Sequence, residues 1–391
     1  MEQEQQFPAC SPETEKQLCE YRFSAMLFRL LEEITDLHPA WGLLTGIRPV
    51  KKVQPLLGQG LSKAEVCEKL HEKYWIAPEK LSLVYDTAMV QQPLLEKTPK
   101  HGISLYVSIP FCPTRCSYCS FVSHSIAQAQ NLIPAYLEKL CEELKIWGQL
   151  VREQELLVDT VYFGGGTPTS LTAAQLEQVL TAVQENFDLS HLREYCVEAG
   201  RPDTITSEKL QTLRRFGVDR ISVNPQTMQD HVLETIGRKH TTAQTVEAFR
   251  MARAAGFENI NMDLIVGLPG ETEDEFAELC EFLQNVGIER VGVFEYSPEE
   301  GTEAAELPDQ IDDETKQNRR LIVEELQSGV LDDYNTSRHG EVMQVLCEGF
   351  DEEQDLWYGR TYADSVEVDG HVTLTRRIRT GRRRVCVRSH H

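Results

Sequence analysis

Hydrophobic positions between residues 101 and 300 follow two alternating patterns. Short apolar runs of strand length are separated by longer stretches in which apolar residues recur three and four positions apart, the spacing of one helix face. The stretch 137–144 is one of these, and the stretch 176–183 comes after the capping-box pattern Thr172-x-x-Gln175. The apolar runs that predict strands are 103–111, 157–163, 195–199, 220–224, 260–266 and 291–296.

Regular alternation of strand and helix predicts an α/β fold in which a parallel sheet is wrapped by helices. Six such units are too few for the usual closed barrel of eight, so we expect an open (β/α)6 barrel, which is a partial TIM barrel. In barrels of this kind the functional residues gather at the carboxyl ends of the strands. The residues that follow each predicted strand are therefore the candidates for chemistry.

The remaining segments surround this core. We expect an N-terminal accessory region of mixed α/β character at residues 1–100, the barrel core at 101–305 and a helical linker at 306–334. Alternating apolar residues predict a small β-rich region at 335–375. The last segment, 376–391, holds seven arginines and no acidic residue, so mutual repulsion predicts a disordered tail.

The formal net charge of the 391-residue chain is −23, which argues against general binding to nucleic acid. Contact with RNA or the ribosome is expected, if at all, only through the C-terminal region. No run of 18 apolar residues predicts a membrane span, and the start Met1–Glu4 does not resemble a signal peptide. We therefore expect a cytoplasmic protein whose eleven cysteines are reduced thiols or metal ligands.

Three cysteines lie close together directly after the first predicted strand. Cys112, Cys116 and Cys119 have the spacing C-x3-C-x2-C, which lets three thiolates converge on one metal centre. A four-iron cluster normally takes four cysteines, so three leave one iron open to bind a small molecule. The alternative, a zinc knuckle, requires four ligands that usually come as two separated pairs, and no second C-x2-C occurs in the sequence. The pattern favours a [4Fe-4S] cluster.

The segment from Tyr106 to Cys112, together with Tyr118 and Cys119, resembles the radical S-adenosylmethionine (SAM) superfamily and, within it, the oxygen-independent coproporphyrinogen III oxidases. Residues 1–100 are similar to the HemZ branch of that group. The resemblance implies that the open iron binds the amino and carboxylate groups of SAM. It also implies that one electron from the cluster cleaves the sulfonium and releases a 5′-deoxyadenosyl radical, while the protein positions the cofactor.

The same resemblance implies roles for residues at the strand ends, where carboxylates, an amide and a guanidinium match the polar groups of SAM. Tyr106 and the three cysteines form the expected catalytic set. The expected SAM-binding residues are Tyr106, Gly165, Gly166, Thr167, Glu198, Gln226, Arg238, Asp263, Phe294 and Tyr296. The first four lie near the cluster and the methionyl end, the next four around the nucleoside, and the last two along the remaining wall. Two segments depart from the oxidase pattern: Ser120 and Phe121 follow the loop where the oxidases have a further cysteine, and 224–226 reads Asn-Pro-Gln in place of Gly-Val-Gln.

From about residue 287 onward the chain resembles a different radical SAM family, the enzymes that methylthiolate an aspartate of ribosomal protein S12. The matching segments are 291–302, 345–350 and 359–364. The last two are similar to the start of the small TRAM domain of that family, and the pattern stops after Thr375. The C-terminal region is therefore expected to be a truncated TRAM-like domain. The two resemblances meet near 267–271, so an oxidase-like front is joined to a methylthiotransferase-like end.

Three functions are open at this point. The favoured one converts coproporphyrinogen III to protoporphyrinogen IX by removing hydrogen and carbon dioxide from propionate side chains, and it needs an external electron donor of the flavodoxin or ferredoxin type. The second is methylthiotransfer to ribosomal protein S12, although that family uses a further cluster for which Cys10, Cys19 and Cys67 are the only candidates. The third is a haem-binding chaperone. Its candidate ligands are His124, His231 and His240.

Overall fold

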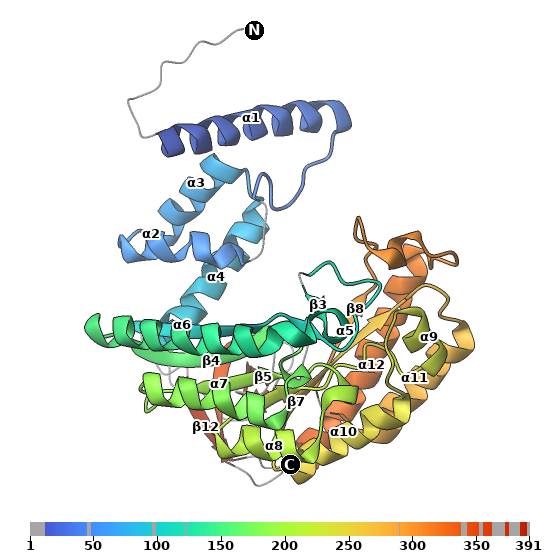
Figure 1. The fold of residues 1–391 in the computed structure, drawn as a ribbon. Coiled ribbons are helices and arrows are strands. Elements are labelled where there is room, and N and C mark those ends of the chain that lie inside the picture. The colour runs from blue at the N-terminus through green and yellow to red at the C-terminus, as the bar shows by residue number, and fades with distance from the viewer. Residues whose placement is uncertain are drawn as a thin grey trace. The chain divides into compact units, whose positions relative to one another are not determined.

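The computed structural model describes residues 12–44, 48–95, 99–121, 123–288, 290–337, 342–351, 355–361, 372–374 and 384–388. The chain divides into two compact units, residues 1–100 and 101–391 (Figure 1). Of the candidate residues above, Cys10 lies outside the described ranges. Within these ranges, none of the helices is long and apolar enough to cross a membrane.

The described part of the N-terminal unit is helical. Its elements are α1 (Pro12–Thr35), the 3-10 turn η1 (Pro49–Lys52), α2 (Gln54–Gly58), α3 (Lys63–Tyr74) and α4 (Pro78–Leu95). Helix α3 begins at a complete capping box formed by Ser62 and Glu65. Its buried apolar residues recur at helical spacing, as Val66 and Leu70 do. The expectation of a mixed α/β region was therefore wrong for the residues of this unit that the structure describes.

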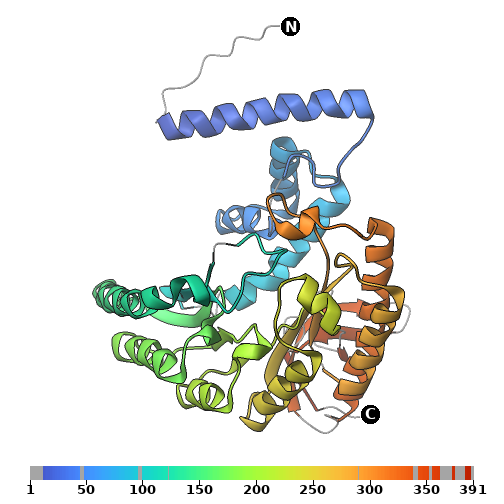
Figure 2. The ribbon, with the colours of Figure 1, turned by 45° about the vertical axis from the view of Figure 1, so that its right-hand side comes forward.

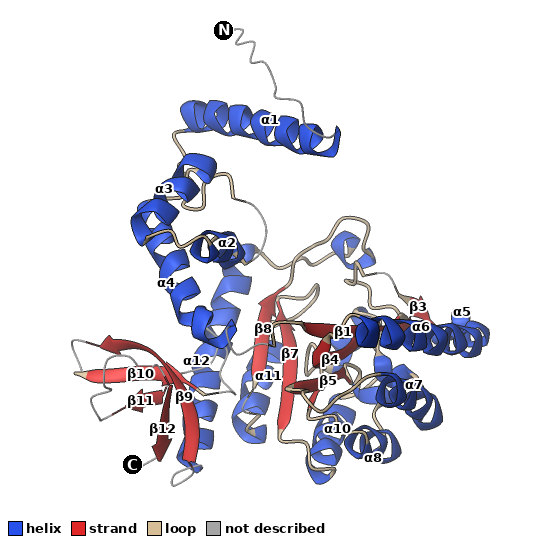
Figure 3. Ribbon diagram, turned by 90° about the vertical axis from the view of Figure 1, so that its left-hand side faces the viewer, coloured by secondary structure: helices blue, strands red, loops and turns tan. Residues whose placement is uncertain are grey.

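A six-stranded parallel sheet forms the centre of the second unit (Figure 3). Its strands are β1 (Gly102–Ile109), β4 (Leu157–Gly165), β5 (Glu194–Glu198), β6 (Arg220–Ser222), β7 (Asn259–Val266) and β8 (Val291–Glu295). They follow one another in chain order across the sheet, every pair is parallel, and β1 and β8 form its two edges. The predicted open (β/α)6 barrel is confirmed. Two short strands, β2 (Phe111–Cys112) and β3 (His124–Ser125), pair beside it.

Helices lie between successive strands and cover the outer side of the sheet (Figure 2). They are α5 (Ile126–Ala129), α6 (Ile133–Glu153), α7 (Ala173–Asn186), α8 (Ser207–Arg215), α9 (Asp230–Thr235), α10 (Thr242–Ala254), α11 (Glu273–Val286) and α12 (Asp313–Ser337). The accompanying 3-10 turns are η2 (Gln130–Leu132), η3 (Pro168–Ser170), η4 (Pro202–Thr204) and η5 (Glu303–Glu306). The predicted capping box of Thr172 and Gln175 is present at the start of α7.

The two faces of the sheet differ in chemistry. On the outer face, side chains such as Phe163, Val197 and Leu264 are fully buried in the main apolar core with the helices. The alternate positions of the same strands point to the inner face and are polar, as Glu198 and Asp263 are. A parallel sheet usually buries apolar residues on both faces, so a polar inner face marks the place where a ligand is expected.

The C-terminal strands form a separate antiparallel sheet in the order β11-β10-β9-β12. They are β9 (Val342–Asp351), β10 (Leu356–Arg360), β11 (Val372–Leu374) and β12 (Arg384–Arg388). Strand β12 pairs with β9, with Val385 opposite Val345. The expectation of a disordered tail from residue 376 was therefore wrong for 384–388. The alternation of valine with polar residues there suits a strand, and pairing with β9 satisfies its backbone despite the positive charge.

Candidate active site

The three cysteines lie on one loop that follows the carboxyl end of β1. Cys112 closes β2, and the Cys119 N–H donates a hydrogen bond to the Cys116 carbonyl at 3.1 Å. All three are free thiols and half-buried. In the parts of the chain that the structure describes, no three metal-binding side chains are grouped tightly enough for a single ion. A cubane bonds each cysteine to a different iron, so the thiols of a cluster loop need not meet at one point.

The surroundings of these thiols fit a thiolate-bound cluster. Thr167 Oγ1 donates a hydrogen bond to Cys112 Sγ at 3.6 Å, and Arg201 Nη1 donates one to Cys116 Sγ at 3.8 Å. Burial raises the pKa of Cys116, but the positive charges of Arg238 and Arg201 outweigh it and lower the pKa of this thiol below its ordinary value. Because the thiolate is the form that binds iron, the loop is prepared for a cluster.

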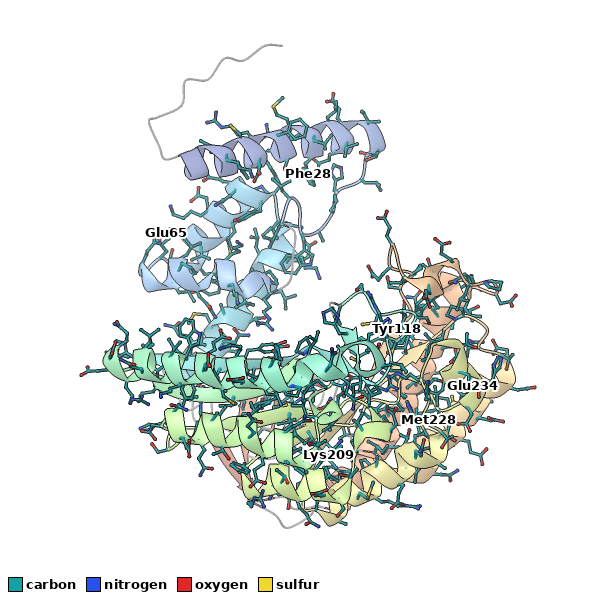
Figure 4. The ribbon with its side chains drawn as sticks, in the orientation of Figure 1. Phe28, Glu65, Tyr118, Lys209, Met228 and Glu234 are labelled. Carbon is teal, nitrogen blue, oxygen red and sulfur yellow. The ribbon has the colours of Figure 1, made fainter. Side chains whose placement is uncertain are left out.

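Arg238 connects the cysteine loop to the end of β6. Its Nη2 donates a hydrogen bond at 3.1 Å to the hydroxyl of Tyr118, which Figure 4 labels. Its Nη1 donates to the carbonyls of Asn224 and Pro225. The Nε of this almost fully buried guanidinium has no hydrogen-bond partner among the described residues. The sequence placed Arg238 around the nucleoside, and in the structure its Nη1 bonds to backbone carbonyls after β6 while its Nη2 bonds to the cysteine loop.

The glycine segment after β4 approaches the cysteine loop closely. Gly165 has φ of +104°, a conformation that side chains rarely adopt. The Gly166 N–H donates to the Ile109 carbonyl at 2.8 Å. A Cβ at Gly166 would lie only 2.8 Å from the Phe111 carbonyl oxygen and 3.0 Å from Cys112 Sγ. Glycine is therefore required for this backbone to lie directly against the first thiol.

Polar side chains on the inner face of the sheet line a small cavity of about 120 Å³. Its lining residues are Tyr162, Cys196, Glu198, Arg220, Ser222, Asn224, Asn261 and Asp263. Tyr162 Oη donates a hydrogen bond to Glu198, and Asn224 Nδ2 donates one to Asp263 Oδ2 at 2.8 Å. The Ser222 hydroxyl is buried and has no partner in the described ranges. Two carboxylates and an unpaired hydroxyl fit a ligand that carries hydroxyl and amino groups, as SAM does.

Burial raises the pKa of both cavity carboxyl groups. For Glu198, loss of solvation is the largest cause, the hydrogen bond from Tyr162 opposes it, and the nearby charge of Asp263 adds to it. For Asp263, loss of solvation is again the largest cause, and a hydrogen bond with Asn261 opposes it. Carboxyl groups whose pKa is shifted inside a cavity are typical of functional sites.

Tyr106 extends the inner face towards the edge of the sheet. It is in register with Tyr162 on the neighbouring strand, and the two rings stack with centroids 5.7 Å apart and planes 11° apart. Its side chain is 60% exposed, and a Cβ at Gly164 would lie 2.8 Å from its hydroxyl. Burial of part of the ring and the charge of Glu198 raise the pKa of Tyr106.

Of the predicted SAM-binding residues only Glu198 and Asp263 line this cavity, and Gln226, Phe294 and Tyr296 are among those that do not. Gln226 has a left-handed φ of +73°, and its backbone bridges to β7 through the Asp263 carbonyl at 3.1 Å and the Ile265 N–H at 2.7 Å. Phe294 is 56% exposed on β8. Tyr296 is only 4% exposed and packs in a separate apolar cluster. The other buried members of that cluster are Val232, Leu233, Ile236, Leu268 and Ala304.

Sequence analysis assigned no role to several residues of this site: Tyr162, Cys196, Arg220, Ser222 and Asn261 in the cavity, and Arg201 beside the cysteine loop. Tyr162 holds Glu198 and stacks on Tyr106, and Arg201 contacts Cys116. A signal for Tyr162 exists, because it is the polar position that alternates with apolar ones near the end of a predicted strand. Arg201 follows the predicted strand 195–199 and so had a positional signal, but nothing local indicates its partner thiol, which lies 85 residues away in the sequence.

The three candidate haem ligands occupy different settings. His124 begins β3, and His231 is exposed on α9, where its Nδ1 lies 3.2 Å from Glu275 Oε1. His240 is buried, and neither of its ring nitrogens has a hydrogen-bond partner among the described residues.

An open six-stranded α/β barrel with a three-cysteine loop and a polar cavity at its strand ends defines an enzyme of the radical SAM type. Residues 106–283 match the family described as "Radical SAM superfamily", and residues 340–387 match the one described as "TRAM domain". The chain belongs to the radical SAM superfamily. The TRAM match includes most of β12, in agreement with the pairing of that strand with β9.

Several curated relatives are similar to this chain. The "Oxygen-independent coproporphyrinogen-III oxidase-like protein HemZ" of Bacillus subtilis is 42% identical over 257 residues, which are 65% of this chain and 51% of the relative. The "Ribosomal protein uS12 methylthiotransferase RimO" of Clostridium botulinum is 37% identical over 350 residues, 87% of this chain and 72% of the relative. The "Heme chaperone HemW" of Lactococcus lactis is 43% identical over 169 residues, 43% of this chain and 42% of the relative.

Among solved structures, coproporphyrinogen III oxidase (HemN) from Escherichia coli, titled a radical SAM enzyme, aligns with a TM-score of 0.54 and 27% identity. The alignment covers 62% of this chain and 56% of that one. The chain thus spans about half the length of its HemZ relative.

Proposed function

We propose that this chain oxidatively decarboxylates coproporphyrinogen III to protoporphyrinogen IX with a [4Fe-4S] cluster and SAM. The observation that carries the proposal is the 42% identity with the HemZ relative over 257 residues. The likeness to the HemN structure supports the same class. The polar cavity at the strand ends beside the cysteine loop supports SAM as the ligand.

In this proposal Cys112, Cys116 and Cys119 would hold the cluster, and the residues at the strand ends would bind SAM. When bound, the cluster and SAM would supply the chemistry that removes a hydrogen atom from a propionate side chain of the substrate. The electron enters from an external donor of the flavodoxin or ferredoxin type. The electron left after loss of carbon dioxide passes to an external acceptor, so that each propionate becomes a vinyl group.

In this proposal different polar groups at the strand ends bind different parts of SAM. Gly165, Gly166 and Thr167 give the methionyl end a backbone that it can approach closely. Glu198 accepts a hydrogen bond from Tyr162 and Asp263 accepts one from Asn224, and each carboxylate has lone pairs left for hydroxyl or amino groups of SAM.

The remaining proposed contacts act at the rim of the cavity. Gln226 and Arg238 hold the end of β6, where the guanidinium fixes the carbonyls of Asn224 and Pro225. Phe294 extends the inner wall, because a Cβ at Gly292 would lie 3.4 Å both from its ring and from Asp263 Oδ1.

Methylthiotransfer is the second candidate, because the RimO relative is matched over 72% of its length and the chain has a TRAM region. The candidate ligands of a second cluster speak against it. Cys19 is exposed on α1, whereas Cys67 packs against the helical core of the N-terminal unit, with its Sγ 3.9 Å from the Leu81 carbonyl oxygen. These two thiols belong to different settings, and neither is part of a cysteine loop.

Product identity separates the candidates. Anaerobic, cluster-loaded protein is given a reductant, SAM and coproporphyrinogen III, and in parallel the ribosomal protein S12. We expect 5′-deoxyadenosine and a porphyrinogen lacking two carboxyl groups by mass spectrometry, with no reaction in the Cys116→Ala variant. A methylthio adduct on S12 with intact porphyrinogen would overturn the proposal in favour of methylthiotransfer. Stoichiometric haem binding without cleavage of SAM would overturn it in favour of a chaperone.

A further inference from the structure

One buried guanidinium outside the predicted site contacts the cysteine loop directly. Arg201 lies three residues after the end of β5 at Glu198 and is 3% exposed. Its Nε and Nη2 donate to the two carboxylate oxygens of Asp203, each at 3.0 Å. Arginine matches a carboxylate with two parallel hydrogen bonds, so Asp203 fixes the plane of the guanidinium.

The remaining nitrogen of the Arg201 guanidinium, Nη1, faces the cysteine loop. Arg201 Nη1 lies 3.3 Å from the Thr114 carbonyl oxygen, 3.2 Å from Thr114 Oγ1 and 3.8 Å from Cys116 Sγ. Thr114 Oγ1 in turn donates to the Gly237 carbonyl at 2.8 Å. The guanidinium therefore reaches from its carboxylate clamp to the second thiol, in a setting with little solvent.

The backbone that carries Arg201 is also fixed. The Thr204 hydroxyl donates to the Arg201 carbonyl at 2.7 Å and closes turn η4. Lys209, labelled in Figure 4, donates from Nζ to the Thr204 carbonyl at 2.8 Å. His240 fills the space beside the clamp, with its Nδ1 4.0 Å from Asp203 Oδ1. The cation is thus held in place by several elements.

Arg238, the other buried guanidinium near the loop, makes its hydrogen bonds to the Tyr118 hydroxyl and to backbone carbonyls. Both guanidinium groups act on the Cys116 thiol, and Arg201 reaches its sulfur with Nη1 at 3.8 Å from the β5 side of the loop. Hydrogen bonds and positive charge at the sulfurs of an iron–sulfur cluster stabilise the reduced, more negative form and so raise its reduction potential.

We propose that Arg201, oriented by Asp203, is a positioning residue that raises the reduction potential of the cluster through its contact with Cys116. The inference rests on the proposed function, since it requires a cluster on Cys112, Cys116 and Cys119. A higher reduction potential makes transfer of the first electron to the cluster more favourable, and this role does not require Arg201 to contact SAM or substrate.

The test is a reductive titration of the cluster, followed by electron paramagnetic resonance, in SAM-free protein. Arg201→Gln removes the charge and is expected to make reduction about tenfold less favourable, a shift of about 59 mV to more negative potential for one electron. Arg201→Lys keeps the positive charge but cannot donate to Asp203 and Cys116 at the same time from a planar group, so an intermediate shift is expected. Asp203→Asn leaves Arg201 less neutralised, and the potential is expected to rise.

Opposite signs for Arg201→Gln and Asp203→Asn distinguish a charge effect from simple loosening of the loop. Arg319→Gln is the matched control, because Arg319 is equally buried and pairs with Glu271 at 2.7 Å outside the cysteine loop. It is expected to lower the melting temperature and leave the potential unchanged. As a second readout, iron loss to a chelator from the oxidised protein should be severalfold faster in Arg201→Gln.

Equal potentials in all variants, or shifts of the same sign for Arg201→Gln and Asp203→Asn, would overturn the role of Arg201 and leave the cluster assignment intact. If Arg201→Gln holds no cluster, the sign for Asp203→Asn decides: a rise supports the inference, and a fall or no change overturns it. A wild-type protein that assembles no cluster would overturn the proposed function together with this inference.

Discussion

Strands β4–β7 and strand β8 belong to one sheet but present different chemistry on its inner face. Strands β4–β7, together with Asn224 two residues after β6, carry a tyrosine, carboxylates and amides that are linked by hydrogen bonds, such as Tyr162 to Glu198 and Asn224 to Asp263. Strand β8 contributes Gly292 and the exposed ring of Phe294.

This difference indicates that the polar strands and β8 have different roles in ligand binding. The polar strands can bind SAM through paired hydrogen bonds, whereas β8 offers only shape and apolar surface. Tyr296, which the sequence placed on the same wall, instead packs with residues of α9 in a separate cluster. Changes to the polar side chains of β4–β7 should therefore weaken SAM binding more than changes in or after β8. The predictions below test that contrast.

The largest effect is expected at the cysteine loop. Replacing Cys112, Cys116 or Cys119 by alanine removes one of three ligands, so anaerobically purified protein should lose its brown absorbance and most of its iron. Iron and sulfide analysis measures this. Cys141→Ala on α6, also half-buried, is the control and should keep the cluster. Iron content that survives all three replacements together contradicts the assignment.

The next effect concerns the two carboxylates of the cavity. Asp263→Ala and Glu198→Ala should each weaken SAM binding while the cluster stays in place. A hydrogen bond that involves a charged group contributes about 1.5–3 kcal/mol, which corresponds to roughly a ten- to hundredfold loss of affinity. Isothermal titration of the cluster-loaded protein with SAM measures it.

The matched control for these variants is Asp219→Ala. Asp219 is exposed, but its carboxylate also accepts a hydrogen bond, from the Tyr195 N–H at 3.1 Å, and it lies at the amino end of β6, away from the cysteine loop. Its affinity for SAM should match that of the wild type. If both cavity variants bind SAM as the control does, their carboxylates have structural roles only.

A smaller effect is expected from pH. Burial raises the pKa of Glu198 above that of an ordinary glutamate, so its carboxylate takes up a proton at a higher pH than usual. If the ionised form accepts hydrogen bonds from SAM, affinity should fall as the pH is lowered through this pKa, by about tenfold for each further pH unit. Glu198→Gln cannot ionise, so the difference between its profile and that of the wild type isolates this group. Parallel profiles contradict the role of Glu198.

The contrast between the strands also shows which features the sequence could predict. Six strands follow from local periodicity and the cluster loop from cysteine spacing, because both are encoded within a few neighbouring residues. Strand β12 was missed because its pairing with β9 is a long-range interaction, whereas the local charge of seven arginines suggested disorder. Arg201 was missed for the same physical reason, since its contact with Cys116 exists only in the folded chain.

The smallest effect is expected for Tyr296→Phe, which tests whether changes after β8 leave SAM binding intact. The Tyr296 hydroxyl is buried and has no hydrogen-bond partner among the described residues. Burying an unpaired polar group costs about 1–3 kcal/mol, so removing it should leave the melting temperature equal or higher. Because the ring packs outside the cavity, the affinity for SAM should not change.

Tyr162→Phe is the matched comparison, because it removes the hydrogen bond to Glu198. Such a bond contributes about 0.5–1.5 kcal/mol, or somewhat more for a charged partner, so SAM binding should weaken several-fold. A loss of SAM affinity in Tyr296→Phe as large as in Tyr162→Phe would place Tyr296 on the cofactor wall after all and remove the distinction between β8 and the polar strands.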